Sequence, residues 1–359
     1  SLAHHHFPSD HYTHHIPFKT AMAASTMKAV LLKAFGGAEQ MYIGDAPKPQ
    51  ISSKDILIRV KAAGINRADI QQRRGKYPAP PGESDIMGLE VAGVVEEVGE
   101  EVKKFHPGDE VMALLGGGGY AQYVSVDAGH AMAVPKGYSM VQAAGVMETY
   151  MTTFQTLFWL GKVSKGEKVL IHGGASGIGT SAIQLAKSLP GVRIFATAGT
   201  DEKCKVCEDL GAEKCINYKK TPDFVTEILA ATKDEPGGAG VDFILDFVGQ
   251  QYLQQNLTLL RNDGRLVYLA MLSGPIAEKI DMGPILRKRL SILGTTLRAR
   301  SSDYKTRLVS DFEAYGAELL DEGILKPIID ETFDWSKIGE AHEHMEANKN
   351  SGKIIITGM

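Results

Sequence analysis

The fold of this chain is decided by eight residues between a predicted strand and a predicted helix, His172-Gly173-Gly174-Ala175-Ser176-Gly177-Ile178-Gly179. In such a turn small residues let the backbone approach a dinucleotide pyrophosphate, which then lies at the positive end of the helix. Serine occupies the middle place of the usual G-x-G-x-x-G spacing. A glycine turn that serves only packing is the alternative. We predict a dinucleotide site formed by Gly174, Ser176, Gly177, Ile178 and Gly179.

Downstream of this turn, short apolar strands alternate regularly with helices. Nearly continuous apolar strands with helices between them are typical of a parallel sheet covered on both faces. The expected strands lie at 168–174, 193–199, 215–218, 241–249, 265–270 and 290–297, and the expected helices at 178–189, 201–211, 224–232 and 252–260. Residues 150–297 are therefore predicted to form a doubly wound α/β domain of the Rossmann type.

The chain before the turn is β-rich. Short β-branched runs separated by glycine and proline, without helices between them, predict a rolled antiparallel sheet. These runs lie at 29–34, 55–64, 90–99, 109–115 and 120–126. A helix at 149–160 leads into the α/β domain, and two helices with a final strand follow it, at 305–322, 341–350 and 353–358. The last segment most simply rejoins the first domain, which gives one domain of 27–149 with 298–359 and another of 150–297.

The composition describes an ordinary globular chain. Its 359 residues suit two domains, and 43% hydrophobic residues are enough for a sizeable core. A formal net charge of −4 gives no broad basic field, so nucleic acid is not an expected partner. No apolar run is long enough to span a bilayer, and a membrane is not expected either. The cysteines form no disulfide framework, which favours a reducing compartment and a cytoplasmic location; they are Cys204, Cys207 and Cys215.

The first 26 residues differ from the rest of the chain. They are rich in histidine, lack periodicity and end in a run of small residues. We interpret residues 1–26 as a disordered extension, an organellar targeting segment or the remnant of an expression tag. Metal capture by the histidines is a weaker alternative.

The end of the second strand of the α/β domain bears on the choice of cofactor. NAD enzymes carry an acidic residue there, which binds the ribose 2′-hydroxyl and repels a 2′-phosphate. Here the strand end is neutral. The hydroxyls of Thr200 and Tyr218, together with the cation of Lys203, could bind a 2′-phosphate. The segment therefore favours NADPH over NADH, although Asp201 would serve NADH if the strand ran longer. The residues expected to hold the 2′-phosphate side are Gly199, Thr200, Lys203 and Tyr218.

Several further motifs precede the turn in a fixed order. They are Gly64-Ile65-Asn66-Arg67-Ala68-Asp69, Gly75-Lys76-Tyr77-Pro78, Gly88-Leu89-Glu90-Val91-Ala92-Gly93 and His106-Pro107-Gly108-Asp109. With the turn, they resemble the zinc-free quinone oxidoreductase branch of the medium-chain dehydrogenase/reductase superfamily, over residues 27 to about 353. The resemblance implies a GroES-like β-rich catalytic domain, a Rossmann cofactor domain and NADPH as cofactor. It also implies a homodimer joined through the sheet edge at 289–296, because an apolar edge strand needs cover.

The resemblance also bears on zinc. Alcohol dehydrogenases of this superfamily hold a catalytic Zn²⁺ through a cysteine, a histidine and a second cysteine. At the matching places this chain has Asn66, Leu89 and Glu148, and the cysteine lobe of a structural zinc is absent. The CxxC at Cys204 and Cys207 lies on a predicted helix, where ordinary helix residues are the simpler interpretation. No metal is therefore expected.

Asn66 and Tyr77 are the catalytic residues that the resemblance implies. Asn66 would orient the acceptor carbonyl or the nicotinamide ribose, and Tyr77 would stack on the acceptor or donate a hydrogen bond to it. The alternatives are an asparagine that satisfies a turn and a tyrosine that only packs. Other cofactor contacts are expected on the helix between the domains and at the carboxyl edge of the sheet. They are Thr152, Phe247, Val248, Leu269, Met271 and Arg298.

The expected activity is hydride transfer from NADPH to a small quinone without metal, because an electron-poor ring accepts hydride unaided. One alternative is reduction of an activated C=C bond in an enal, enone or enoyl thioester, with Tyr77 as the proton donor. Another is a crystallin-like or RNA-binding NADPH protein with little catalysis.

Overall fold

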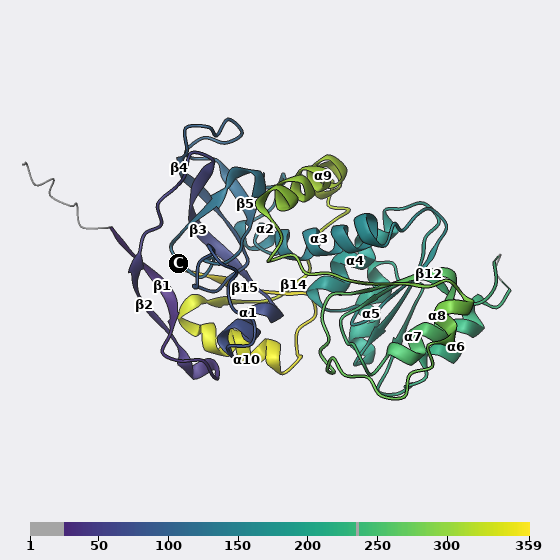
Figure 1. Ribbon diagram of the computed structural model, residues 1–359. Coiled ribbons are helices and arrows are strands. Elements are labelled where there is room, and N and C mark those ends of the chain that lie inside the picture. Colours follow the sequence, from purple (N-terminus) through teal and green to yellow (C-terminus); the bar gives the residue numbers. More distant parts are fainter. Residues whose placement is uncertain (1–24, 235–236) are drawn as a thin grey trace, which may run out of the picture.

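The computed structural model describes residues 25–234 and 237–359, so the predicted extension lies outside the described residues except for its last two. Thr26 was assigned to the extension but belongs to the first strand, since it pairs with Pro47. Figure 1 shows two lobes joined side by side. One contains the purple and blue early elements with the yellow C-terminal ones, and the other is teal and green.

The first lobe is built on seven strands. They are β3 (Asp55–Ile65), β4 (Glu90–Val98), β5 (Glu110–Leu114), β6 (Tyr123–Asp127), β7 (Ala131–Ala133), β14 (Ile329–Asp334) and β15 (Lys353–Thr357). The order is β14-β15-β3-β4-β5-β7, and β6 also pairs with β3. The pairs are antiparallel, as expected, except that β14 runs parallel to β15. Because β15 pairs with β3, the last strand of the chain belongs to the sheet of the first lobe.

Short elements complete this lobe, and sequence reasoning missed several of them. A separate hairpin pairs β1 (Thr26–Leu32) with β2 (Met41–Pro47). The helices are α1 (Arg67–Arg73), α2 (Met140–Ala143), α9 (Ser302–Asp321) and α10 (Ile338–Glu346), with 3-10 turns η1 (Ala38–Gln40), η2 (Ala128–His130) and η4 (Trp335–Lys337). The helix α1 was not expected, because its sequence RADIQQR has a single large apolar residue and thus no helical periodicity.

The second lobe is the predicted doubly wound domain. Its strands are β8 (Lys168–Ile171), β9 (Arg193–Ala198), β10 (Lys214–Asn217), β11 (Val241–Asp246), β12 (Leu260–Tyr268) and β13 (Ser291–Gly294). All of them pair in parallel, in the order β10-β9-β8-β11-β12-β13. Its helices are α4 (Gly177–Lys187), α5 (Asp201–Leu210), α6 (Phe224–Thr232), α7 (Leu253–Leu259) and α8 (Gly283–Arg287). The strand order reverses at β8, and ligands of such sheets bind at the carboxyl end of the strand where it reverses.

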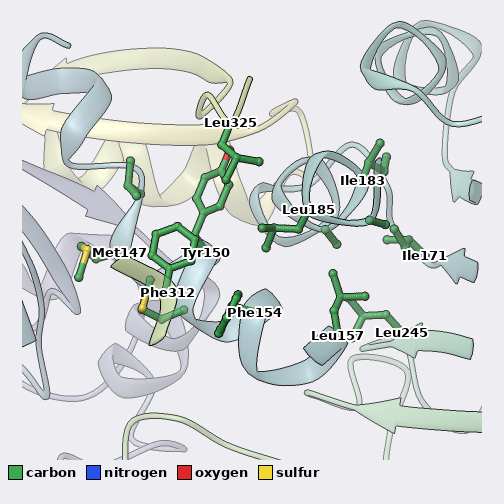
Figure 2. Packing of buried hydrophobic residues seen from close by; sticks show 14 of the residues in the cluster. Met147, Tyr150, Phe154, Leu157, Ile171, Ile183, Leu185, Leu245, Phe312 and Leu325 are labelled. Carbon is green, nitrogen blue, oxygen red and sulfur yellow. The ribbon is translucent and has the colours of Figure 1, made fainter. Parts of the chain in front are cut away.

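The helix between the lobes is held by the largest core of the protein. It begins as α3 (Met147–Phe154), continues as a π-helical turn, η3 (Gln155–Leu160), and ends at Gly161 as predicted. Figure 2 shows its buried side chains packed against α4, the parallel sheet and α9. The labelled residues are Met147, Tyr150, Phe154, Leu157, Ile171, Ile183, Leu185, Leu245, Phe312 and Leu325. This packing fixes the first turn of α3 at the junction of the two lobes.

Among the helices of residues 25–234 and 237–359, none is long and apolar enough to cross a bilayer.

Candidate active site

The predicted phosphate turn lies at the carboxyl end of β8 and begins α4. The Ser176 hydroxyl accepts a hydrogen bond from Gly179 N at 3.0 Å and so caps the helix. Gly173 has φ +58°, a conformation that glycine adopts without strain. A Cβ on Gly179 would lie 2.4 Å from the carbonyl oxygens of both Gly173 and Gly174. A side-chain-free turn at the N-terminus of an 11-residue helix fits the pyrophosphate of a nicotinamide dinucleotide.

The residues predicted to bind the 2′-phosphate side come together at the ends of β9 and β10, because these strands are parallel neighbours. A Cβ on Gly199 would lie 2.7 Å from the Tyr218 hydroxyl. The Thr200 hydroxyl accepts from Lys203 N at 3.2 Å and caps α5. The Lys203 ammonium donates to the main-chain oxygen of Asn348 at 2.7 Å.

The acidic and basic side chains at this end of the sheet have different surroundings. The Asp201 carboxylate is held by Lys220 and by the Asn217 amide at 2.7 Å, and these contacts lower its pKa. Asp201 is therefore neutralised from the side of β10. Burial lowers the pKa of Lys203; the Asp330 carboxylate opposes this shift, whereas the cations Lys219 and Arg67 lower the pKa further. A bound anion would relieve this crowding of positive charge.

Two loops meet beside the turn at the carboxyl edge of the sheet. The Phe247 ring lies against Gly173, where an added Cβ would be 2.5 Å from the ring. Ser273 N donates to the Val248 oxygen at 2.7 Å, and Gly249 packs against the backbone of Met271. The structure therefore brings together the loop residues predicted from the sequence, namely Phe247, Val248, Leu269 and Met271.

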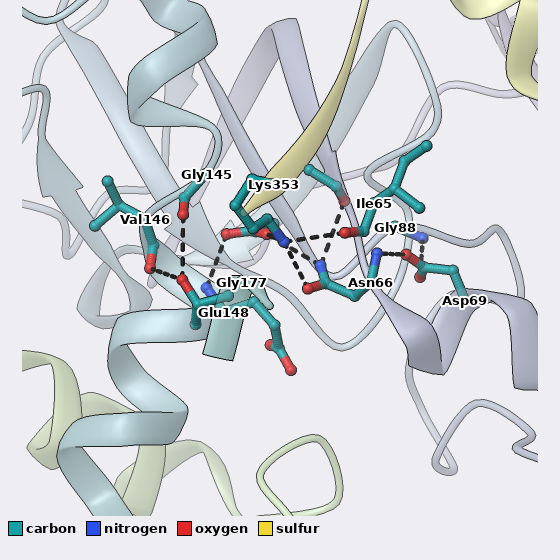
Figure 3. A network of polar contacts seen from close by, with 12 residues as sticks. Ile65, Asn66, Asp69, Gly88, Gly145, Val146, Glu148, Gly177 and Lys353 are labelled. Carbon is teal, nitrogen blue, oxygen red and sulfur yellow. Dashed lines mark hydrogen bonds and ion pairs between the residues drawn. The ribbon is translucent and has the colours of Figure 1, made fainter. Parts of the chain in front are cut away.

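A buried polar network lies where the first sheet meets α3 (Figure 3). The strand β3 ends at Ile65, and its antiparallel neighbours β4 and β15 begin beside that end with Glu90 and Lys353. The two side chains form an ion pair of 2.6 Å, with Glu90 fully buried and Lys353 only 3% exposed. Gly64 makes room for it, because a Cβ there would lie 2.3 Å from the Glu90 carboxylate.

Asn66 joins this network through both ends of its amide. Its Oδ1 accepts from Lys353 Nζ at 2.7 Å, and its Nδ2 donates to Glu90 Oε1 at 3.0 Å. Its backbone N–H donates to Asp69 at 2.8 Å, and burial raises the pKa of that carboxyl to about 6. Asn66 thus holds the network together, and its direct contact with an acceptor stays a prediction.

The three positions that match zinc ligands carry neither cysteine nor histidine; they are Asn66, Leu89 and Glu148. Leu89 is buried and has no donor atom. Asn66 is committed to Lys353 and Glu90, and Glu90 is already paired. Across residues 25–234 and 237–359, the one cluster of three ligating groups is elsewhere, formed by Asp330, Glu331 and His344.

Tyr77 and Arg298 lie together in the structure. The Arg298 guanidinium is 5.4 Å from the centre of the Tyr77 ring, and it donates to Gly116 O at 2.7 Å and to Gln72 Oε1 at 2.8 Å. Burial raises the pKa of the half-buried Tyr77, and the charge of Glu148 raises it further. Arg298 is therefore directed toward the first lobe. Its cofactor contact and that of Thr152, which is buried on α3, stay predictions.

Glu90, Lys353 and Glu148 were not predicted as site residues. The sequence did contain a signal for Glu90 and Lys353, because each is a charged residue directly before an apolar run, in GLEVAG and KIIIT. Only the pairing of β3 with β4 and β15 shows that these charges meet. Burial and the adjacent Glu90 raise the pKa of Glu148 to about 8.

A dinucleotide turn at the reversal point of a parallel sheet, facing a β-rich lobe with a buried polar network, defines a two-lobed nicotinamide-dependent oxidoreductase. Residues 52–136 match the alcohol dehydrogenase GroES-like domain, and residues 177–314 match the zinc-binding dehydrogenase family. The human quinone oxidoreductase is 30% identical over 342 residues, covering 94% of this chain and 99% of the relative. The chain belongs to the medium-chain dehydrogenase/reductase superfamily.

Other similar proteins are described as something other than quinone oxidoreductases. A synaptic vesicle membrane protein VAT-1 homolog of Danio rerio is 30% identical over 346 residues, covering 92% of this chain and 70% of the relative. A solved NAD-dependent alcohol dehydrogenase superposes with a TM-score of 0.81 at 29% identity, covering 93% of this chain and all of that one. The CurK enoyl reductase gives 0.80 at 26%, covering 92% and 99%. The motifs between Gly64 and Asp109 also predict a narrower likeness to the p53-inducible quinone oxidoreductase.

Proposed function

We propose that the protein transfers a hydride from NADPH to a small quinone without a metal ion. The observation that carries the proposal is at two of the positions that match zinc ligands: Asn66 is bound to Lys353 and Glu90, and Leu89 is buried with no atom that could bind a metal. An alcohol needs a Lewis acid to lose hydride readily, whereas an electron-poor quinone accepts hydride without one. The human quinone oxidoreductase supports the same choice of acceptor.

When bound, the reduced nicotinamide supplies the hydride. The turn of Gly174, Ser176, Gly177, Ile178 and Gly179 would hold its pyrophosphate. The 2′-phosphate side would lie against Gly199, Thr200, Lys203 and Tyr218. The nicotinamide side would lie near Thr152, Phe247, Val248, Leu269, Met271 and Arg298, with Tyr77 against the acceptor. Most of the rate enhancement would then come from holding the nicotinamide and the acceptor in the right geometry for hydride transfer.

We further propose a cytoplasmic homodimer. The strand β13 pairs only with β12 in its sheet and forms its edge. Apolar side chains are exposed on and near that edge, with Ile292 40%, Met282 62% and Leu286 82% exposed. Such an edge is protected when a second copy covers it. The proposed domain boundaries are 27–149 with 298–359, and 150–297.

Lys203→Ala is expected to weaken NADPH binding about ten- to a hundredfold while NADH binding changes little, because only NADPH has a 2′-phosphate. Fluorescence titration with both cofactors measures this. Lys205→Ala is the matched control, since Lys205 lies on the same helix and pairs with Asp209 at 2.8 Å. Equal weakening of both cofactors, or a wild-type preference for NADH, contradicts NADPH specificity.

Reduction of an activated C=C bond is the second candidate, and the likeness to the CurK enoyl reductase favours it. The same hydride transfer would serve, but the carbanion formed from an alkene needs a proton donor more than a quinone oxyanion does. Tyr77 is the residue that separates the two candidates.

Tyr77→Phe is expected to leave turnover of 1,2-naphthoquinone within about threefold, and Tyr77→Ala is expected to raise KM, because the ring stacks on a flat acceptor. The assay compares 1,2-naphthoquinone with trans-2-hexenal at saturating NADPH. Strong wild-type turnover of the alkenal, with a loss of about 10²–10⁴-fold in kcat for Tyr77→Phe, would move the function to the double-bond reductase. If neither acceptor leads to NADPH oxidation, the alternative of a crystallin-like or RNA-binding NADPH protein with little catalysis would be favoured.

A further inference from the structure

Glu148 is adjacent to the buried network of Glu90, Lys353 and Asn66, but its carboxyl forms no hydrogen bond with these residues. The Glu148 backbone N–H donates to Glu90 Oε2 at 2.9 Å. Its side-chain carboxyl makes no hydrogen bond or ion pair with any residue of 25–234 or 237–359. Figure 3 shows this side chain extending from the start of α3 away from Lys353 and Asn66. Within the described part of the chain, no hydrogen bond or ion pair therefore accounts for this carboxyl.

Charged groups from four other elements act on Glu148. Glu90 opens β4, Asp69 lies on α1, Lys353 opens β15 and Arg298 follows β13. The ammonium of Lys353 is already paired with Glu90 at 2.6 Å. Burial and Glu90 raise the pKa of Glu148 to about 8, while Lys353 and Arg298 oppose the shift. At neutral pH the group therefore carries its proton.

The chain at Glu148 lies close to the phosphate turn. The neighbouring Thr149 and the stem of Lys353 flank Gly177, the first residue of α4, at 3.3 and 2.8 Å from where its Cβ would be. The charge of Glu148 also acts on the Tyr77 hydroxyl. The residue after Glu148 thus packs against the start of α4, and the Glu148 carboxyl interacts electrostatically with the residue expected to face the acceptor.

We propose that Glu148 is the catalytic acid that protonates the acceptor after hydride transfer; this rests on the proposed reductase function. The hydride of the reduced nicotinamide brings both electrons and leaves an anionic oxygen on the acceptor. The O–H bond of Glu148 breaks as an O–H bond forms on that oxygen. Glu148 remains as a carboxylate and regains a proton from water when the product leaves.

Tyr77 is the weaker candidate for this step. Burial and the charge of Glu148 raise the pKa of its hydroxyl above the usual value. A general acid works best when its pKa lies near the operating pH, which Glu148 satisfies. This assignment leaves Tyr77 to stack on the acceptor, consistent with the mild effect expected for Tyr77→Phe.

Glu148→Gln tests the proposal, because glutamine keeps the shape of the neutral acid without its proton. The wild-type kcat/KM for 1,2-naphthoquinone is expected to be level at neutral pH and to fall as the pH rises through about 8. In Glu148→Gln it should be about 10²-fold lower and independent of pH in that range. Infrared spectroscopy of the cofactor-free protein gives a readout apart from turnover. A protonated carboxyl band should titrate near pH 8 and be missing in the variant.

Glu340→Gln, at an exposed glutamate of α10, is the control and should keep the wild-type rate and profile. An active wild-type protein whose rate and pH profile survive in Glu148→Gln overturns the acid role and leaves the reductase function standing. A wild-type protein that reduces neither quinone nor alkenal overturns both. Should the variant fail to fold, the wild-type protein still decides, since a level rate from neutral pH to about pH 10 contradicts the proposal.

Discussion

Replacing Lys353 by methionine is expected to lower the free energy of unfolding by about 3–5 kcal/mol, the usual loss when one partner of a buried ion pair is removed. Glu90 is fully buried, and its carboxylate would lose the ammonium at 2.6 Å that balances its charge. Asn66 would also lose the donor to its Oδ1. Urea unfolding followed by circular dichroism measures the change as a shift of the midpoint at an unchanged slope.

A double variant separates charge imbalance from packing. Glu90→Gln together with Lys353→Met removes both charges, and it should recover much of the stability that Lys353→Met loses. Lys28→Met is the exposed control, because its partner Asp45 lies at 2.8 Å but both side chains are at least half exposed. That variant should lose no more than about 1 kcal/mol. A similarly small loss in Lys353→Met would contradict a tightly coupled buried pair.

Gly179→Ala is expected to weaken NADPH binding by at least about a hundredfold, or roughly 3 kcal/mol. The added Cβ would lie 2.4 Å from two backbone oxygens, which cannot move aside as a flexible side chain would. The turn must therefore shift away from the position that a pyrophosphate requires. Fluorescence titration with NADPH measures the affinity, and thermal unfolding shows whether the fold has survived.

Gly339→Ala provides the matched control on α10. The nearest atoms to its added Cβ lie at 3.7 and 3.9 Å, so nothing has to move. Alanine is favoured over glycine within a helix by up to about 1 kcal/mol, and NADPH affinity should be unchanged. If Gly179→Ala binds NADPH like the wild-type protein, the turn serves packing alone.

The second lobe follows closely from local sequence. Most of its strands are short apolar runs, and the four helices expected from the sequence were found, so neighbouring residues suffice to place them. The exceptions are α8, which was not expected, and the polar start of β12, which precedes the predicted strand at 265–270. The turn at Gly174 is equally local, because small residues and a helix start lie within eight positions. In the first lobe, β14 was missed, since IDETFD has charged residues at three of six positions and pairs only along one edge.

The active-site network was not predictable in this way. Glu90 and Lys353 lie far apart in the chain, and each by itself looks like a polar residue that opens a strand. They meet because β4 and β15 both run antiparallel to β3 and both begin beside its last residues. A shift of one residue in either register would move the side chain to the other face of the sheet.

The sequence by itself therefore determined the parallel sheet, its dinucleotide turn and the β-rich first lobe, because each depends on residues that are near neighbours along the chain. Only the tertiary structure decided that Asn66 binds inside an ion pair and that Asp201 is turned toward Lys220. It also brought Glu148 beside Glu90, which together with burial raises the pKa of Glu148 to about 8. These features depend on burial and on charges brought together across strands and lobes, which no local pattern encodes.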